Sequence, residues 1–478
     1  MKHRSRTIRV LLLATTLLSL VFVASAPAAF PGQNGRIAFT SRADGNTEIY
    51  SVNPDGTDLL NLTNSPAADG DPSWSPDGRK MAFVSDREGP AVIFVMNADG
   101  SDKTRLTHNA EEEHDPIWSP DGTKIAFRRG GFFTRKLMVM NAGGGGEVML
   151  APGDRPSWSP DGSRLAFDTA GFDSGEIWVA NADGTGLANL SQNGDFGDDA
   201  NAAWSPLDDL IAYQSRQELP AGPARIFTVS ADGGAPVART GGDDVQPHWS
   251  PNGEELAFSH QPVLSTSISD EIHVIRLDGS DERAITDFDD GGALGPTWSP
   301  AGDKIAFIVR YPTSGAYDLY VIDSDGANPI KLSGSSFGGF DWQAVQDRDP
   351  ECGAVRADPA ELWPPNRALR AVSLHGATDP DGDAVALVVD SVTQDEPVVT
   401  KGEATSPDAV IAPSGELRLR AERNPHGDGR VYRIAFSATD GQGGSCSGLA
   451  SISAPRLKKV SAFDSAPPSF DSLRPSAH

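Results

Sequence analysis

The sequence has little of several features that define common protein classes. Only two of its 478 residues are cysteine, and its 40 basic residues are far outnumbered by 66 acidic ones. The resulting formal net charge of −26 repels phosphate backbones, which argues against a nucleic-acid-binding protein. Beyond residue 30, no apolar run reaches the roughly eighteen residues that a membrane-spanning helix needs. Helical spacing of apolar residues is also missing from the long middle part of the chain, which favours an all-β protein.

The first 28 residues are organised like a secretory signal. Basic residues precede the apolar run Val10–Val23, and small residues follow at Ala26 and Ala28. This order predicts export with cleavage at or near Ala28, and an uncleaved membrane anchor is the alternative. We therefore expect a mature protein that is secreted, periplasmic or at the cell surface, with no membrane span after cleavage.

The middle of the sequence is dominated by repetition. The stretch DPSWSPDGRKMAF, from Asp71 to Phe83, returns with small changes as DPIWSPDGTKIAF and RPSWSPDGSRLAF. Successive copies of its tryptophan are 44, 40, 46, 45, 49 and 44 residues apart. The copies are Trp74, Trp118, Trp158, Trp204, Trp249, Trp298 and, in a weaker form, Trp342. A period of this length fits four short strands with their turns.

Each period indeed reads as four antiparallel strands. Pro76 and Gly78 suit the tight turn after the tryptophan, and alternating segments such as EIYSV precede a second turn containing Asp-Gly. Four-stranded units of this size are the blades of a β-propeller, which bury their apolar faces against one another. The repeated tryptophan is the expected filler between blades.

The two ends of the repeat region complement each other. The first unit begins at a second strand around Phe39, whereas Trp342 lies on a first strand with no blade after it. We predict that these two strands pair and close a seven-bladed β-propeller over residues 32–345.

The signature P-x-W-S-P-D-G-x-x-[IL]-A-F identifies a related family. It is carried by Pro72–Phe83, Pro116–Phe127 and Pro156–Phe167, and it resembles the propeller repeats of the TolB family. That family has a six-bladed propeller behind a small α/β domain, so six blades is the alternative count. Seven copies, with no such domain before them, argue against the family's role in the envelope-spanning Tol-Pal complex.

A second domain is expected at residues 350–456, where alternating segments again predict strands and no helix. The pattern favours a small immunoglobulin-like sandwich, and the segments LWPPN, LRLRAER and GRVYRIAFSATDGQGG resemble bacterial Ig-like modules, which implies an adhesive or spacer unit. Cys352 and Cys446 both lie here, and a disulfide between them is expected in an oxidising compartment, with two unpaired thiols as the alternative. Residues 457–478 are expected to form a disordered tail.

Motifs with possible catalytic chemistry are weak. GSSFG, from Gly334 to Gly338, matches G-x-S-x-G, but that motif works on a strand-to-helix turn and here is expected in a loop between blades. His108, His114 and His248 could bind a metal in a lyase, although solvated loop histidines and one packed at a blade edge are the favoured interpretation.

Most carboxylates occur in turns. Asp77, Asp121 and Asp161 are interpreted as turn formers. Asp379, Asp381 and Asp383 in DPDGD are a weak Ca²⁺ candidate that lacks a downstream bidentate glutamate, so a surface turn is favoured; the same holds for Asp195 and Asp198.

Together these features predict a non-enzymatic binding protein without a cofactor. Its propeller would engage a protein or glycan of the cell envelope through a loop face or the channel. The alternative is a propeller-type carbohydrate-active enzyme, a polysaccharide lyase or hydrolase with a metal-assisted site in the channel. Such an enzyme needs two carboxylates, or histidines and a metal, converging within about 10 Å.

Overall fold

The structure is a computed structural model that divides into two compact units, residues 1–346 and 347–478. It describes residues 30–131, 134–169, 175–192, 198–216, 222–261, 270–334, 336–346, 348–380, 384–395, 408–422, 429–440, 444–455 and 470–471. Every regular element within these residues is a β-strand, as the sequence predicts. The expected signal, residues 1–28, lies outside the described residues.

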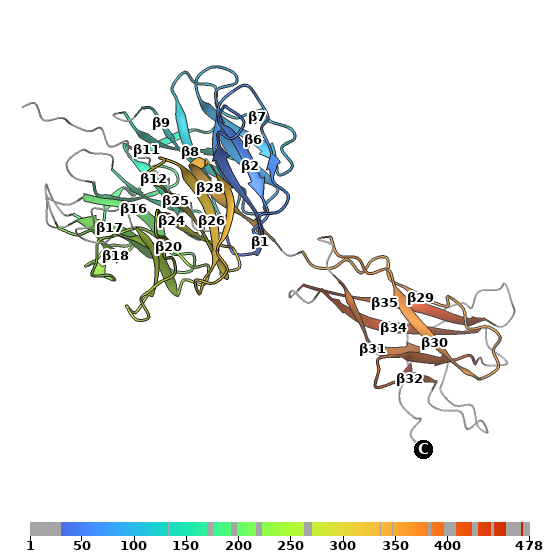
Figure 1. The fold of residues 1–478 in the computed structure, drawn as a ribbon. Coiled ribbons are helices and arrows are strands. Elements are labelled where there is room, and N and C mark those ends of the chain that lie inside the picture. Colours follow the sequence, from blue (N-terminus) through green and yellow to red (C-terminus); the bar gives the residue numbers. More distant parts are fainter. Residues whose placement is uncertain are drawn as a thin grey trace, which may run out of the picture. The chain divides into compact units, whose positions relative to one another are not determined.

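The first unit contains seven four-stranded antiparallel sheets, which follow one another along the chain (Figure 1). Sheet 1 combines strands from both ends of the unit: β28 (Ser336–Val345), β1 (Gln33–Ser41), β2 (Glu48–Val52) and β3 (Leu60–Asn61). Sheets 2 to 4 are β4 (Asp69–Trp74), β5 (Lys80–Ser85), β6 (Val92–Asn97) and β7 (Thr104–Arg105); β8 (Glu113–Trp118), β9 (Lys124–Arg129), β10 (Lys136–Asn141) and β11 (Val148–Ala151); and β12 (Asp154–Trp158), β13 (Arg164–Asp168), β14 (Ile177–Asn181) and β15 (Ala188–Asn189).

The remaining three sheets of this unit have the same order of strands. Sheets 5 to 7 are β16 (Asp198–Trp204), β17 (Leu210–Arg216), β18 (Arg225–Ser230) and β19 (Val237–Ala238); β20 (Asp244–Trp249), β21 (Glu255–His260), β22 (Glu271–Arg276) and β23 (Arg283–Ala284); and β24 (Gly292–Trp298), β25 (Lys304–Arg310), β26 (Tyr317–Asp323) and β27 (Ile330–Gly334). The architecture is that of a β-propeller, in which sheets surround a common axis.

The turn after each tryptophan is built by its own side chains. In sheet 2 the Ser75 hydroxyl donates to Asp77 Oδ1 at 2.7 Å and accepts the Lys80 N–H at 2.9 Å. Gly78 takes a positive φ of 66°, which few other residues adopt without strain. Asp121 and Asp161 make the same bonds in sheets 3 and 4, so the interpretation of these aspartates as turn formers is confirmed.

The seven repeated tryptophans lie in the cores between neighbouring sheets. All are buried, and Trp158, the most exposed of them, keeps 7% of its surface. The Trp118 indole N–H donates to the Ser73 carbonyl of the preceding sheet at 3.2 Å, and Trp249 does the same to Ala203 at 3.0 Å. Burial of an indole stabilises the fold by at most about 5 kcal/mol. The propeller core is therefore a series of layers between sheets.

The predicted closure of the ring is confirmed. β28 pairs antiparallel with β1, with Trp342 opposite Ile37 and Phe340 opposite Phe39. The side chain of Gln343 accepts the Arg36 N–H at 2.9 Å and donates to the Gly78 carbonyl at 2.7 Å. The last strand therefore holds the first sheet and the turn of the second sheet together.

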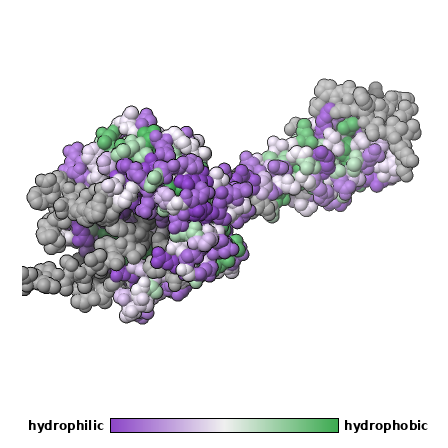
Figure 2. Space-filling view, turned by 90° about the horizontal axis from the view of Figure 1, so that it is seen from above, coloured by the Kyte–Doolittle hydropathy of each residue, from purple (hydrophilic) through white to green (hydrophobic). Residues whose placement is uncertain are grey.

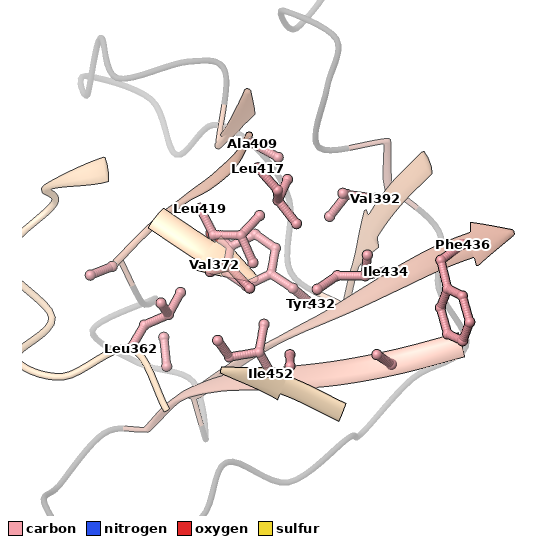
Figure 3. Close-up of a cluster of buried hydrophobic side chains, with 14 of the residues drawn as sticks. Leu362, Val372, Val392, Ala409, Leu417, Leu419, Tyr432, Ile434, Phe436 and Ile452 are labelled. Carbon is pink, nitrogen blue, oxygen red and sulfur yellow. The ribbon is translucent and has the colours of Figure 1, made fainter. Parts of the chain in front are cut away.

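The second unit contains two further four-stranded sheets. They are β29 (Arg356–Asp358), β30 (Leu369–His375), β33 (Leu417–Arg420) and β32 (Ala409–Ile411); and β35 (Ser445–Pro455), β34 (Gly429–Thr439), β31 (Ala386–Gln394) and β36 (Phe470–Asp471). Both sheets contribute to one core, in which Leu417 and Leu419 meet Tyr432 and Ile434 (Figure 3). This is a sandwich of two sheets, and its immunoglobulin-like character stays a prediction.

Two expectations about the second unit can be compared with the structure. The predicted disulfide joins Cys352 and Cys446, 94 residues apart in the chain. The expectation of a disordered tail over 457–478 is wrong at Phe470–Asp471, because these residues pair with Thr393 and Gln394 of β31. The rest of that tail lies outside the described residues.

The visible surface is mainly hydrophilic, with small separate hydrophobic patches (Figure 2). No helix in the described part of the chain is long and apolar enough to cross a membrane.

Candidate functional site

The first strand of most sheets is interrupted by a β-bulge just before its tryptophan. In β4 the register shifts between Gly70 and Ser73, and in β8 it shifts between His114 and Ile117. The residue three positions before the tryptophan has a positive φ in six sheets: Asp71, Asp115, Arg155, Asn201, Gln246 and Gly295. A bulge changes the direction of side chains, and the first strands of most neighbouring blades contact one another. The backbone therefore presents a ring of side chains at this level.

We define the bulge layer as three positions in each sheet. They are the residues four and three before the tryptophan, and the second-strand residue paired with the former. In sheets 2 to 4 these are Gly70, Asp71 and Val84; His114, Asp115 and Arg128; and Asp154, Arg155 and Asp168. In sheets 5 to 7 they are Ala200, Asn201 and Gln214; Val245, Gln246 and Ser259; and Leu294, Gly295 and Ile308. Sheets 2 to 4 thus contain seven ionisable residues at these positions, and sheets 5 to 7 contain none.

In sheets 5 to 7, which we call the neutral side, amides and a hydroxyl hold the layer together. Gln214 Oε1 accepts the Asn201 side-chain N–H at 2.7 Å and the Gln246 backbone N–H of the next sheet at 3.1 Å. Gln246 Oε1 in turn accepts the Gly295 backbone N–H at 3.1 Å and the Ser259 hydroxyl at 3.2 Å. The bulge N–H groups of sheets 6 and 7 are therefore satisfied by neutral side chains of the preceding sheet.

In sheets 2 to 4, the charged side, carboxylates make the corresponding bonds. Asp71 Oδ2 accepts the Asp115 backbone N–H at 3.4 Å, and Asp168 Oδ2 accepts the Asn201 backbone N–H at 3.0 Å. Because Gln214 and Gln246 make equivalent bonds without charge, the carboxylate groups exceed what the bulge requires.

Three guanidinium groups lie among these carboxylates. Arg128 Nε is 3.3 Å from both Asp115 Oδ2 and Asp154 Oδ1. Arg155 Nη1 is 3.1 Å from Asp168 Oδ2. Arg135, from the connection between β9 and β10, places Nη1 2.9 Å from Asp154 Oδ2. The charged side is therefore a connected ionic network across two sheets.

The network is graded in its exposure to solvent. The side chains of Asp154 and Asp168 are 8% and 4% exposed, whereas those of Asp71, His114 and Asp115 keep 26%, 29% and 27%. Loss of hydration raises the pKa of Asp115 to about 6; the neighbouring negative charge of Asp71 adds to this shift and Arg128 opposes it. The exposed end therefore combines two adjacent carboxyl groups and an imidazole, His114 Nδ1 lying 3.8 Å from Asp71 Oδ2.

The three histidines considered from the sequence lie in different places. His108 is exposed after β7, and His114 belongs to the bulge layer of sheet 3. His248 in β20 is 2% exposed, and its Nδ1 accepts the Trp298 backbone N–H at 3.3 Å. Within the described ranges, no group of three or more His, Cys, Asp or Glu residues could hold a metal ion.

The serine motif and the Ca²⁺ candidates gain no support as sites. GSSFG was expected in a loop, but Gly334 ends β27 and Gly338 lies within β28, so the described part of the motif joins two strands rather than a strand and a helix. Asp198 begins β16, whereas Asp195 lies outside the described residues. Of the DPDGD carboxylates, only Asp379 is described, and Asp381 and Asp383 lie outside the described ranges.

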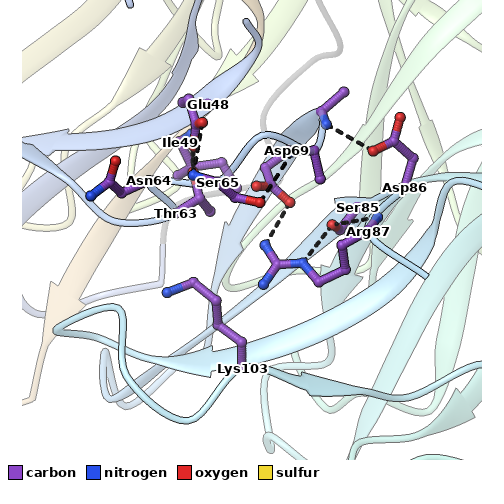
Figure 4. A network of polar contacts seen from close by, with 12 residues as sticks. Glu48, Ile49, Thr63, Asn64, Ser65, Asp69, Ser85, Asp86, Arg87 and Lys103 are labelled. Carbon is purple, nitrogen blue, oxygen red and sulfur yellow. Dashed lines mark hydrogen bonds and ion pairs between the residues drawn. The ribbon is translucent and has the colours of Figure 1, made fainter.

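Other buried carboxylates of the propeller have structural partners. Asp69 Oδ1 is 2.8 Å from Arg87 Nη2, and Glu48 accepts the Thr63 hydroxyl and, at 2.9 Å, the Ser65 N–H (Figure 4). Asp69 is fully buried and Glu48 is nearly so. These groups hold loops to strands and are not candidates for contact with a ligand.

The charged side was not predicted from the sequence. Asp71, Asp115 and Arg155 occupy one position of the aligned repeats, three residues before the tryptophan. The residue type at this position varies while the tryptophan does not, and this variation was the only indication of the site in the sequence. Arg128 and Asp168 join them only through the register of the second strand, which the repeat pattern does not specify.

Comparison with known proteins identifies the propeller repeats. The family model described as the TolB beta propeller domain matches residues 7–155 and 153–338, together more than half of the chain. A curated relative, the uncharacterized peptidase YuxL of Bacillus subtilis (strain 168), is 40% identical over 130 residues, which cover 27% of this chain and 19% of the relative. The chain thus matches about a fifth of that relative's length.

Solved structures with the same fold include an oligogalacturonate lyase from Vibrio parahaemolyticus, with a TM-score of 0.51 and 13% identity, covering 63% of this chain and 90% of the lyase. A prolyl endopeptidase has a TM-score of 0.50 and 13% identity, covering 76% of this chain and 54% of the peptidase. TolB from Acinetobacter baumannii has a TM-score of 0.43 and 17% identity, covering 67% of this chain and 68% of that one. At 13% identity, the similarity to the lyase and to the prolyl endopeptidase, whose TM-scores are 0.50 or above, concerns the fold alone.

Proposed function

Because this chain belongs to the family of TolB beta propeller domains, we propose that it is a non-enzymatic binding protein that engages its partner at the charged side of the bulge layer. The partner is a protein or a glycan of the cell envelope. It contacts the exposed end of the network, formed by Asp71, His114 and Asp115.

One observation carries this proposal: the neutral side makes the same bulge contacts without charge. Ionic networks of low exposure add little net stability, because desolvation offsets much of the attraction between the charges. The seven ionisable residues of sheets 2 to 4 are therefore in excess of the needs of the fold. Their bonds to Arg128 and to one another hold the three exposed groups in fixed positions, which suits recognition of a polar partner.

The protein acts outside the cytoplasm in this proposal. The Cys352–Cys446 disulfide supports an oxidising compartment, in agreement with the secretory signal expected in residues 1–28. The second unit serves as an Ig-like spacer that carries the propeller.

The test uses a triplet exchange within the molecule. The variant His114→Ala/Asp115→Asn/Arg128→Gln gives sheet 3 the residues of sheet 5, namely Ala200, Asn201 and Gln214. Immobilised wild type and variant are incubated with envelope extract and, separately, with an array of envelope glycans, and retained species are compared.

The matched control is Gln214→Ser, which gives sheet 5 the residue of sheet 6 at the same position, Ser259. A species retained by wild type and control but lost with the triplet variant supports the proposal. Equal retention by the wild type and a folded triplet variant would refute contact through the charged side.

A second candidate is a carbohydrate-active enzyme, and the adjacent carboxyl groups of Asp71 and Asp115 favour it. A carboxyl group whose pKa is raised to about 6 beside another carboxylate is suited to general acid–base catalysis. The test is release of new chain ends from oligogalacturonate and related polysaccharides by wild type and by Asp115→Asn. Turnover by wild type that disappears in Asp115→Asn would replace the binding proposal.

A further inference from the structure

The residue directly before each repeated tryptophan faces the next sheet. In sheets 2 to 7 it is Ser73, Ile117, Ser157, Ala203, His248 and Thr297, and in the closing strand β28 it is Asp341. Asp341 is the only carboxylic acid among the seven. Its exposed fraction is 4%, so the closing strand alone carries a buried acid at this position.

The carboxyl group of Asp341 joins two sheets. Oδ2 accepts the Trp74 backbone N–H of β4 at 2.6 Å, and Oδ1 accepts the Trp342 N–H of β28 itself at 2.9 Å. In sheet 4 the hydroxyl of Ser157 makes the equivalent bond to the Trp204 N–H at 2.9 Å. A neutral hydroxyl is therefore sufficient for this contact, and an acid is not required by the geometry.

No positively charged group on the strands around Asp341 pairs with it. β28 contacts β1, β4 and β26, and none of their ionisable residues shares a hydrogen bond or ion pair with Asp341 within the described residues. These residues are Arg36 on β1, Asp69 and Asp71 on β4, and Tyr317, Asp318, Tyr320 and Asp323 on β26. Loss of hydration raises the pKa of Asp341 to about 7, and the two N–H groups only partly oppose this shift.

We propose that Asp341 makes closure of the propeller ring dependent on pH. The contact between β28 and β4, which we call the clasp, is tightest when this carboxyl group carries a proton. In an opened clasp the carboxyl group is hydrated and has its ordinary pKa near 3.8. The closed form therefore binds the proton more strongly, and its advantage is full at low pH. It declines as the pH rises from about 4 and levels off above about 7. A protein exported into an acidic exterior would hold its ring closed and would loosen it toward neutral pH.

The experiment measures local opening by hydrogen exchange and mass spectrometry of the full chain, corrected for the pH dependence of intrinsic exchange. Peptides from β1, β4 and β28 report the clasp, and peptides from β24 on the neutral side, which has no ionisable residue of its own, serve as an internal reference. Between pH 5 and 6.5, the opening constant of the clasp should rise up to tenfold per pH unit, while the reference does not change. A clasp that follows the reference throughout would overturn the proposal.

A variant isolates the carboxyl group. Asp341→Ser gives the closing strand the residue of sheet 4 and keeps an acceptor for the Trp74 N–H. Its clasp should lose the pH dependence and match the reference from pH 5 to 8. Retention of the wild-type pH dependence in Asp341→Ser would assign it to another group and would refute the role of Asp341. Because the wild-type comparison needs no substitution, the proposal stays testable if this variant does not fold.

Discussion

The bulge layer of the propeller is held together by charges on one side and by amides and a hydroxyl on the other. The two sides share a backbone requirement, because a buried N–H group at a bulge needs an acceptor, and on both sides the preceding sheet provides acceptors. Gln214 and Gln246 provide it on the neutral side, and Asp71 and Asp168 provide it on the charged side. The difference separates what the fold requires from what it does not.

The charged side carries a physical cost that the neutral side avoids. Its carboxylates and guanidinium groups are withdrawn from water to exposed fractions as low as 4%, and their mutual attraction only offsets this desolvation. A site that keeps such groups in place without a structural need is a candidate for recognition or chemistry. The two sides thus act as test and control within one molecule.

The largest expected effect on stability comes from removing β28, the strand that closes the ring containing both the charged and the neutral side. Deletion of Phe340–Val345 removes most of β28 and the buried Trp342, and should cost about 5 kcal/mol or more of unfolding free energy. A thermal melt followed by differential scanning calorimetry provides the measurement. An unchanged melting temperature would contradict the role of the closure.

Breaking the charged side at one point should have the next largest effect. Arg128→Gln removes the positive charge that lies between Asp115 and Asp154, so both carboxylates lose an ion pair. The unfolding free energy should fall by about 3 kcal/mol. Denaturant titration at pH 7 measures the change. If the loss of unfolding free energy is no larger than that of the matched variant on the neutral side, the charges of the network do not depend on one another as proposed.

That matched variant is Gln214→Ala on the neutral side. It removes the acceptor of the Gln246 backbone N–H and of the Asn201 side chain, and should cost about 1 to 2 kcal/mol. The same titration serves as the measurement. If Gln214→Ala proved costlier than Arg128→Gln, the contrast between the sides would be reversed.

The smallest expected effect is a pH dependence confined to the charged side. The pKa of Asp115 is raised in the folded protein, so its contribution to stability is favourable at low pH and is lost as the pH rises from about 4 through about 6. The difference in melting temperature between wild type and Asp115→Asn should therefore change over this interval. Gln214→Ser, on the neutral side, should show a constant difference from wild type at every pH.

Much of this fold follows from local rules that the sequence displays. The tryptophan period, the Pro-Asp-Gly turns and the incomplete ends predict blades and their closure, because each depends on neighbouring residues or on a simple count. The charged side depends on contacts between sheets. Arg128 meets Asp154 only because β9 pairs with β8 in a shifted register and sheet 4 follows sheet 3 around the axis. Likewise, the sequence does not distinguish Asp341 from the other acidic residues, because its contact with the next sheet depends on how β28 packs against β4.

The central claim is that the fold does not need the charges of sheet 3, and the unfolding free energy of His114→Ala/Asp115→Asn/Arg128→Gln tests it most directly. The exchanged residues can form the contacts of sheet 5, where an asparagine N–H lies 2.7 Å from a glutamine oxygen. We predict a stability within about 1 kcal/mol of wild type, well above that of Arg128→Gln alone. A triplet variant that loses as much stability as Arg128→Gln alone, or more, would show that these charges serve the fold.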